Sequence, residues 1–282
     1  MLKTRVITAL AIVPFLLLAL FWLPKWAWGV FTLLVVLAAG WEWSRLCGFS
    51  ARAILIYQGI TLVLILVFLG LYLQTRFPGA MRVTSQGLFI ASAVFWLVLA
   101  PLWLLTTWRP KIPAIIGLAG WLVLFPTWAA FLLLHDISPL LLLSLMIIVF
   151  VADIGAYFAG RRFGKVKLAP KVSPGKTWEG VVGGLIAVMA YFMAWFAAAR
   201  HLQFPYWTRD LVDFGMWLPA VFLLLAGVSV VGDLFESWMK RGAGMKDSSN
   251  LLPGHGGVLD RIDALTAALP IAGLLIFVLP KP

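Results

Sequence analysis

Long apolar runs constrain this chain more than any other feature. A helix that crosses a bilayer needs about 20 consecutive, mainly apolar residues, and about nine stretches meet this condition. They cover residues 4–23, 26–46, 53–73, 87–107, 113–134, 138–158, 179–199, 217–237 and 262–280. Only 12% of the residues are charged, which is about half the share found in soluble domains. The sequence therefore predicts an all-α integral membrane protein with about nine transmembrane helices, or eight if Pro24 and Lys25 do not separate the first two runs.

The basic residues indicate how these helices are oriented. Short cytoplasmic loops of membrane proteins carry an excess of Lys and Arg. With nine spans and a cytoplasmic N-terminus, most of the 22 Lys and Arg fall on the cytoplasmic side. The same orientation places the two most polar loops, 159–178 and 238–261, on that side. Because topology accounts for the net charge of +11, and no basic patch interleaved with aromatic residues lies outside the apolar runs, we expect no nucleic-acid partner.

The polar residues divide the chain into two regions. Residues 1–137 contain about five spans, whereas residues 138–282 contain about four spans together with both polar loops. We therefore expect a membrane-embedded N-terminal region and a C-terminal catalytic region whose polar site lies at the cytoplasmic border of the membrane. The single cysteine, Cys47, excludes an internal disulfide and a cysteine-only metal site.

Two acidic residues, Asp153 and Asp233, fall inside apolar runs near their cytoplasmic ends. A carboxylate at that depth needs a partner or a polar cavity. Binding to a loop arginine for purely structural reasons is the alternative to a functional role.

Helical spacing groups further side chains with these acids. Asp233, Glu236, Ser237 and Lys240 are related by steps of three and four, so they share one helix face. Asp260 and Asp263 share a face at the start of the last span, and the loop between the two helices lets the groups meet. Converging carboxylates repel one another in a low-dielectric cleft. A hard divalent cation would relieve this repulsion, and Mg²⁺ fits because it uses few carboxylates and leaves room for phosphate oxygens. Zinc would need more His or Cys than this segment offers.

Cations accompany the acids, in a pattern suited to a triphosphate. They are Lys240, Arg241, Lys246 and Arg261. The turn Pro253-Gly254-His255-Gly256-Gly257 suits a tight loop whose N–H groups approach an anion. His255 could act as a general acid or as a structural anchor. Alternatively, the cations only neutralise the carboxylates or contact lipid head groups.

The loop before residue 179 contains Gly175-Lys176-Thr177, which matches the end of a P-loop. Pro170 stands where the first glycine of that motif belongs, and no strand is expected before it, so the sequence argues against a P-loop. Ser173, Lys176 and Thr177 still precede a helix expected from about residue 179. They therefore form a candidate phosphate-binding helix entrance.

These segments together resemble the phosphatidate cytidylyltransferases, also called CDP-diacylglycerol synthases. The resemblance is carried by Ser237-x-x-Lys240-Arg241-x4-Lys246-Asp247-x5-Pro253-Gly254-His255-Gly256-Gly257-x2-Asp260-Arg261-x-Asp263. It extends to Asp153-Ile154-Gly155-Ala156-Tyr157, to the Ser173–Gly180 segment and to Gly232-Asp233-x-x-Glu236-Ser237. The first half of the chain is similar to that family only as a row of apolar spans.

The resemblance implies an enzyme that makes CDP-diacylglycerol and pyrophosphate from CTP and phosphatidic acid. It also implies Mg²⁺ dependence, K⁺ as a candidate second cation, a homodimer, and a bacterial inner membrane location with the active site facing the cytoplasm. Metal ligands would be Asp233, Asp260 and Asp263, with Asp153 and Glu236 as further candidates. Catalytic roles would fall to Lys240, Asp260, Asp263 and His255. Substrate-binding roles would fall to Ser173, Lys176, Thr177, Ser237, Arg241, Lys246, Asp247, Gly256, Gly257 and Arg261.

Two other functions use similar residues. A CTP-dependent kinase of a membrane lipid alcohol would need the same acids and cations, together with a base for a neutral hydroxyl, and His255 or Asp153 could serve. A transporter would use Asp153 and Asp233 as relay residues. Transporters often contain inverted repeats, and no internal repeat is apparent in this sequence.

Overall fold

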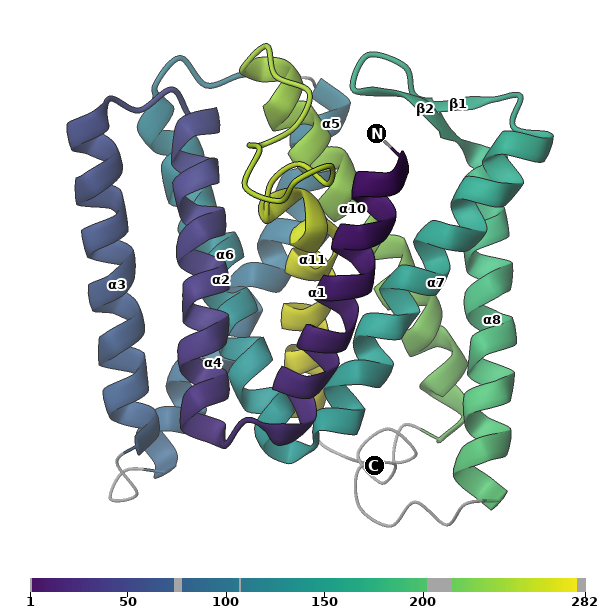
Figure 1. Cartoon of the computed structure of the whole chain (residues 1–282), viewed down its shortest axis with the longest axis horizontal. Helices are drawn as coiled ribbons and strands as arrows, with labels where there is room; N and C mark the ends of the chain where they lie inside the picture. The colour runs from purple at the N-terminus through teal and green to yellow at the C-terminus, as the bar shows by residue number, and fades with distance from the viewer. Residues whose placement is uncertain (1, 74–77, 107, 202–214, 278–282) are drawn as a thin grey trace.

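A computed structural model describes residues 2–73, 78–106, 108–201 and 215–277 as a bundle of long helices (Figure 1). In chain order the elements are α1 (Leu2–Trp22), α2 (Lys25–Leu46), α3 (Ala51–Leu73), α4 (Pro78–Val94), the π-helical turn η1 (Phe95–Leu99), α5 (Ala100–Thr106), α6 (Pro113–Ile137), α7 (Pro139–Phe163), β1 (Lys167–Ala169), β2 (Ser173–Thr177), α8 (Trp178–His201), the 3₁₀ turn η2 (Gly215–Trp217), α10 (Leu218–Gly242) and α11 (Leu259–Phe277).

The prediction of an all-α fold is confirmed apart from one short β-hairpin. Each predicted apolar run coincides with a helix, and α4, η1 and α5 together form one of them. Within the described residues, seven helices are long and apolar enough to cross a membrane: Lys25–Leu46, Ala51–Tyr72, Val83–Thr106, Pro113–Ile137, Pro139–Phe163, Trp178–Ala198 and Gly215–Gly242. Helix α11 is not among them, and it carries Asp260, Arg261 and Asp263 near its start. The described apolar part of α1 is short, Leu10–Trp22, so the count of nine spans stays a prediction.

Local chemistry sets where several helices begin. Helices α6 and α7 start at Pro113 and Pro139, where the missing N–H of proline would have no intrahelical partner in any case. Ser138 caps α7, since its hydroxyl oxygen accepts a hydrogen bond from the N–H of Leu140 at 3.2 Å. The prolines remove an N–H donor and Ser138 satisfies another, so fewer backbone groups are left bare at these helix starts.

Helices α7 and α8 pack closely because small residues line their interface. A Cβ atom on Gly155 would lie 2.6 Å from the Cβ of Ala187, and one on Gly180 would lie 3.0 Å from the carbonyl oxygen of Ala156. Close backbone approach through small residues is typical of helix pairs in membranes. The pair forms a rigid support for the loop that connects it.

That loop contains a β-hairpin, which the sequence did not predict. Strands β1 and β2 pair antiparallel, with Lys167 opposite Thr177 and Ala169 opposite Ser173. The expectation that no strand precedes Pro170 was therefore wrong, because the three residues of β1 are too few to show a strand period. Gly175, Lys176 and Thr177 lie in the extended strand β2, so the argument against a P-loop holds. Helix α8 begins at Trp178, next to the predicted start.

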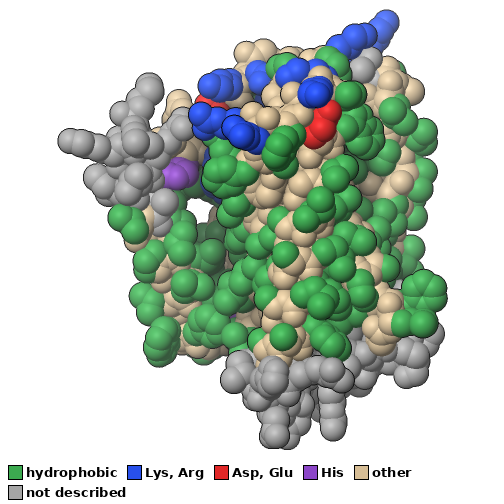
Figure 2. Space-filling view, turned by 90° about the vertical axis from the view of Figure 1, so that its right-hand side faces the viewer, with side chains coloured by type: hydrophobic (Ala, Val, Ile, Leu, Met, Phe, Trp, Pro, Cys, Tyr) green, Lys and Arg blue, Asp and Glu red, His purple; other side chains and the backbone are tan. Residues whose placement is uncertain are grey.

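Both polar loops lie at one end of the bundle, as predicted, and α1 begins at that end too (Figure 1). Figure 2 shows Lys and Arg side chains gathered there, above a flank that is mostly hydrophobic. The exposed cations of the two loops and of the helix ends next to them are Arg161, Arg162, Lys165, Lys167, Lys171, Arg241, Lys246 and Arg261. The structure thus separates a basic end from an apolar belt. That the basic end faces the cytoplasm remains a prediction.

Cysteine labelling tests this orientation. Burial raises the pKa of the Cys47 thiol to about 12, so the native cysteine should not react with maleimides. We expect Lys246→Cys, at the basic end, to react with a membrane-impermeant maleimide in inside-out vesicles and to stay unlabelled in right-side-out vesicles. Met216→Cys is the matched control, because Met216 is 85% exposed in η2, which directly precedes α10, whereas Lys246 follows the other end of that helix. The reverse pattern for the two variants would contradict the predicted topology.

Candidate active site

A cleft of about 610 Å³ opens at the basic end between α7, the hairpin with α8, α10 and α11. Its charged lining residues are Asp153, Arg161, Lys176, Asp233, Lys240, Asp247, Asp260, Arg261 and Asp263. Tyr157, Ser173, Gly175, Thr177 and Gly180 also line it. The segments that the sequence identified far apart along the chain therefore meet in one place.

The Lys240 side chain joins α10 to α11. Its ammonium lies 2.5 Å from Glu236 Oε2 and 2.6 Å from Asp260 Oδ1. All three side chains are almost buried, at 13%, 3% and 4% exposure. Glu236 and Lys240 stand one helical turn apart, as the spacing predicted. Two carboxylates withdrawn from water thus share one cation, which lowers the cost of burying them.

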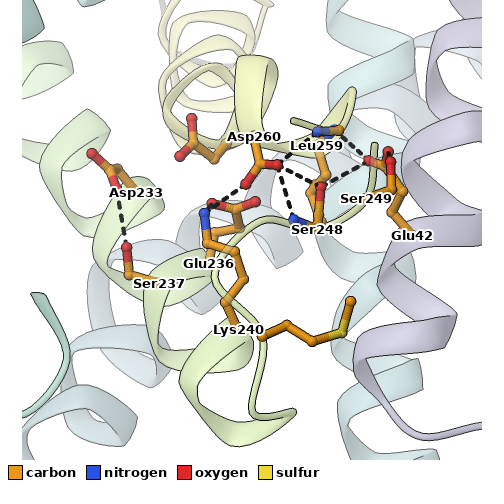
Figure 3. Close-up of polar contacts among 12 residues, drawn as sticks. Glu42, Asp233, Glu236, Ser237, Lys240, Ser248, Ser249, Leu259 and Asp260 are labelled. Carbon is orange, nitrogen blue, oxygen red and sulfur yellow. Dashed lines mark hydrogen bonds and ion pairs between the residues drawn. The ribbon is translucent and has the colours of Figure 1, made fainter. Parts of the chain in front are cut away.

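Asp260 also fixes the start of α11 (Figure 3). Its second oxygen, Oδ2, accepts hydrogen bonds from the Gly257 N–H at 2.7 Å, the Ser248 N–H at 2.9 Å and the Ser248 hydroxyl at 3.0 Å. A carboxylate that accepts an N–H three residues earlier acts as in a capping box. Asp260 is therefore occupied on both oxygens by the protein itself.

The glycine turn serves this same carboxylate. Gly256 has φ +81°, and a Cβ atom there would lie 2.6 Å from Asp260 Oδ2, so no other residue fits without strain. The prediction that N–H groups of this turn approach an anion holds for Gly257, but the anion is the Asp260 carboxylate of the protein itself. His255 is not among the described residues that line the cleft. Its Nδ1 atom is buried without a hydrogen-bond partner in the described part of the chain.

A second group of acids faces the cleft beside the first. Asp233 accepts a hydrogen bond from the Ser237 hydroxyl at 3.3 Å, and its other oxygen lies 2.5 Å from the Lys176 ammonium. Lys176 belongs to β2, so this ion pair ties the hairpin to α10. Asp153 and Asp263 line the cleft as well.

The predicted metal ligands Asp233, Asp260 and Asp263 thus line one cleft, but they do not form a single cluster. Among the residues that the structure describes, no three His, Cys, Asp or Glu side chains are grouped closely enough to hold a metal ion. Asp260 is paired with Lys240, and Glu236, also paired with Lys240, is not among the described cleft-lining residues. Lysine ammonium groups stand beside carboxylates on both sides of the cleft.

The predicted helix entrance lies at the cleft. Ser173, Lys176 and Thr177 line it, and Thr177 Oγ1 caps α8 by accepting the Gly180 N–H at 3.1 Å. Asp247 and Arg261 line the cleft too. Five other predicted substrate-binding residues are not among its described lining residues: Ser237, Arg241, Lys246, Gly256 and Gly257. Both Arg241 and Lys246 are exposed, and Arg241 Nη1 donates to the Met245 carbonyl at 3.5 Å.

Sequence reasoning missed two features of this end. Arg161 lines the cleft from α7 and donates to the Tyr157 hydroxyl at 3.1 Å. Glu42 in α2 is fully buried, and its carboxylate contacts the 248–259 segment (Figure 3). Glu42 is an acid inside the apolar run 26–46, so the rule that identified Asp153 and Asp233 could have found it. No signal in the sequence pointed to Arg161 beyond its charge.

The charges of the cleft nearly cancel. Five lining carboxylates, of Asp153, Asp233, Asp247, Asp260 and Asp263, face the four cations of Arg161, Lys176, Lys240 and Arg261. Lys176 and Lys240 are paired with acids, whereas Arg161 and Arg261 form no ion pair with a described carboxylate. Those two guanidinium groups are therefore free to bind phosphate oxygens, for which their planar donors are suited.

Comparison with known proteins places the whole chain in one family. The model of the cytidylyltransferase family matches residues 3–279. A phosphatidate cytidylyltransferase of Pseudomonas aeruginosa is 40% identical over 98% of this chain and 97% of its own length. The enzymes of the same name from Haemophilus influenzae and Thermotoga maritima are 38% and 32% identical, over 98% and 99% of this chain and 99% and 97% of their own lengths. A cleft of acids and phosphate-binding cations at the end of a helical bundle, together with these matches over nearly every residue, shows that the chain belongs to the cytidylyltransferase family.

Proposed function

We propose that this chain is a phosphatidate cytidylyltransferase, which forms CDP-diacylglycerol and pyrophosphate from CTP and phosphatidic acid. The cleft carries this proposal: it opens at the basic end of an apolar bundle, where a water-soluble nucleotide and a membrane lipid can both arrive. The family match and the names of the full-length relatives support it.

The reaction joins two anions, and the cleft has almost no net charge with which to hold them. With five carboxylates against four cations, its lining cannot by itself offset the charge of a triphosphate and a phosphatidate. We therefore propose that Mg²⁺ binds with the nucleotide, and K⁺ is a further candidate cation. Asp233, Asp263 and Asp153 offer the hard oxygen donors that Mg²⁺ prefers, and it needs only one or two carboxylates when phosphate oxygens complete its shell. When bound, it would neutralise phosphate charge and hold the triphosphate in place.

The chemical step needs no general base. An oxygen of the phosphatidate phosphate is already anionic, so it can attack the α-phosphorus of CTP directly. The new P–O bond forms as the bond to the β-phosphate breaks, and pyrophosphate leaves with the electron pair. This agrees with a cleft in which His255 is not among the described lining residues. Arg161 and Arg261 would counter most of the phosphate charge, and Lys240 would contribute less because it is paired with Glu236 and Asp260. Positioning would supply most of the rate gain.

The lipid substrate and the fold together suggest the cellular setting. We propose that the protein resides in the bacterial inner membrane with the cleft facing the cytoplasm, where CTP is available. We also propose a homodimer, from the family resemblance. The seven apolar helices and the bacterial relatives support the membrane location.

A lipid kinase that uses CTP is the alternative, since Asp153 lines the cleft and could serve as a base. The two activities differ in their products. Purified protein is supplied with cytidine-labelled CTP and phosphatidate, with and without Mg²⁺. We expect the label in the lipid, with pyrophosphate released, and only when Mg²⁺ is present. Label recovered as CDP would instead support a kinase.

The two acids of α11 should differ in how their loss acts. We expect Asp263→Asn and Asp260→Asn each to abolish turnover in protein that still inserts into the membrane. Because Asp260 contacts Lys240, Ser248 and Gly257, its substitution should also lower the melting temperature in detergent, whereas Asp263→Asn should change it little. Turnover and thermal unfolding are measured on the same preparations. Full activity of Asp263→Asn would reject its assignment to the metal site, and full activity of Asp260→Asn would show that the contacts of Asp260 with Lys240, Ser248 and Gly257 are not needed for turnover.

Neighbouring arginines on α7 provide a matched test of phosphatidate binding. Arg161 lines the cleft, whereas the equally exposed Arg162 is not among its described lining residues. Loss of one charged hydrogen bond to a phosphate costs about 1.5–3 kcal/mol, so Arg161→Ala should raise the KM for phosphatidate about tenfold or more. Arg162→Ala removes the same charge and should leave it nearly unchanged. Both are assayed in mixed micelles at saturating CTP. Equal effects of the two substitutions would mean that surface charge, and not the cleft, attracts the lipid.

A further inference from the structure

Glu42 is a fully buried carboxylate that comes from α2, far from the motifs that line the cleft. Four donors surround it. Oε1 accepts from the Ser249 hydroxyl at 2.5 Å and the Val258 N–H at 2.9 Å. Oε2 accepts from the Leu259 N–H at 2.6 Å and the Ser248 hydroxyl at 3.2 Å. A carboxylate with this many donors is held in one place and holds them in turn.

These donors come from both ends of the 248–259 segment. Ser248 and Ser249 follow α10, while Val258 directly precedes α11 and Leu259 is its first residue. Glu42 therefore closes the loop and also satisfies two of the free N–H groups at the start of α11. The space is tight, because a Cβ atom on Gly257 would collide with Ser248 Oγ and with Glu42 Oε1. Packing and hydrogen bonding thus fix the same contact.

A chain of contacts leads from Glu42 to the cleft. The Ser248 hydroxyl lies 3.2 Å from Glu42 Oε2 and 3.0 Å from Asp260 Oδ2, so its single proton is shared between two acids. Asp260 in turn binds Lys240 at 2.6 Å. Figure 3 shows Glu42, Ser248, Asp260 and Lys240 in this order from α2 to α10. Glu42 is not itself among the described cleft-lining residues.

We propose that Glu42 is a positioning residue for the transfer reaction: it fixes Ser248 and the first turn of α11, and through them it aims Asp260 and Lys240 into the cleft. This inference rests on the proposed function. A glutamine could not replace the acid, since its NH₂ group would face N–H and O–H groups that also donate. The carboxylate is needed as an acceptor on both oxygens, although it does not touch a substrate.

The decisive variant is Glu42→Gln, which keeps the size of the side chain. Loss of a partner that orients an active-site group typically costs 10–100-fold, so we expect kcat to fall by about this factor. The KM values for CTP and phosphatidate should change less than about threefold, because the walls that bind them keep their residues. Thr127→Val is the control. It removes a buried hydroxyl that contacts the Thr266 carbonyl of α11 at 3.3 Å. Neither residue is among the described cleft-lining residues, so kcat should stay unchanged.

Serine variants decide the matter if Glu42→Gln does not fold. Ser248 contacts both acids, whereas Ser249 contacts Glu42 without contacting Asp260 among the hydrogen bonds of the described residues. We expect Ser248→Ala to lower kcat about tenfold and Ser249→Ala less than threefold. Where Glu42→Gln does fold, its combination with Ser248→Ala should have a kcat little lower than that of the less active single variant, because both substitutions act on one chain of contacts.

The outcomes separate this inference from the proposed function. If the wild-type protein makes no CDP-diacylglycerol, the proposed function is wrong. If the wild-type protein is active and Glu42→Gln keeps the wild-type kcat, the positioning role is wrong. Equal losses in Ser248→Ala and Ser249→Ala would indicate general destabilisation of the 248–259 segment. Losses in Glu42→Gln and Ser248→Ala that simply multiply would indicate that the two residues act independently. Either result would also overturn the positioning role.

Discussion

The Lys240 ammonium is shared by two carboxylates inside a bundle that has little water to offer them. Burying either Glu236 or Asp260 alone would cost several kcal/mol, and the lysine alone would cost as much. Together, at 2.5 and 2.6 Å, they bind the end of α10 to the start of α11. Removing Lys240 would leave two buried carboxylates without their cation, so the lysine holds both acids in place. The position of the cleft follows from this constraint.

The two lysines of the cleft are held very differently. Lys240 is 13% exposed and contacts two acids, while Lys176 is 26% exposed and reaches Asp233 from a two-stranded hairpin. Ion pairs that water can reach contribute little, about 0–1 kcal/mol. Incoming phosphate groups can therefore compete for Lys176 far more easily than for Lys240. Where α10 meets α11, Lys240 stays with its two acids. On the hairpin side, Lys176 can exchange Asp233 for a phosphate group when a ligand binds.

Much of this arrangement could be predicted from residue spacing. Apolar length located the helices, and steps of three and four placed Asp233, Glu236 and Lys240 on one face of α10. Charge placement predicted that loops 159–178 and 238–261 share one end. The sequence could not predict which acids pair with lysine and which stay available for a metal ion, because the two kinds of carboxylate look alike in sequence. Asp260 fits a metal site by spacing, yet its two oxygens are occupied by Lys240, Ser248 and Gly257.

Contacts between distant segments were beyond such reasoning for a physical reason. A helix period shows which residues share a face, but the identity of the opposite face depends on how helices pack, and apolar helices in a membrane carry little information about their neighbours. Glu42 lies more than 200 positions before the segment it binds, and its neighbours in α2 are mostly apolar or aromatic. An acid in such a place still has to find donors. The bare N–H groups at the start of α11 are donors that every helix start exposes, so a buried acid without a local partner should be sought beside a helix N-terminus.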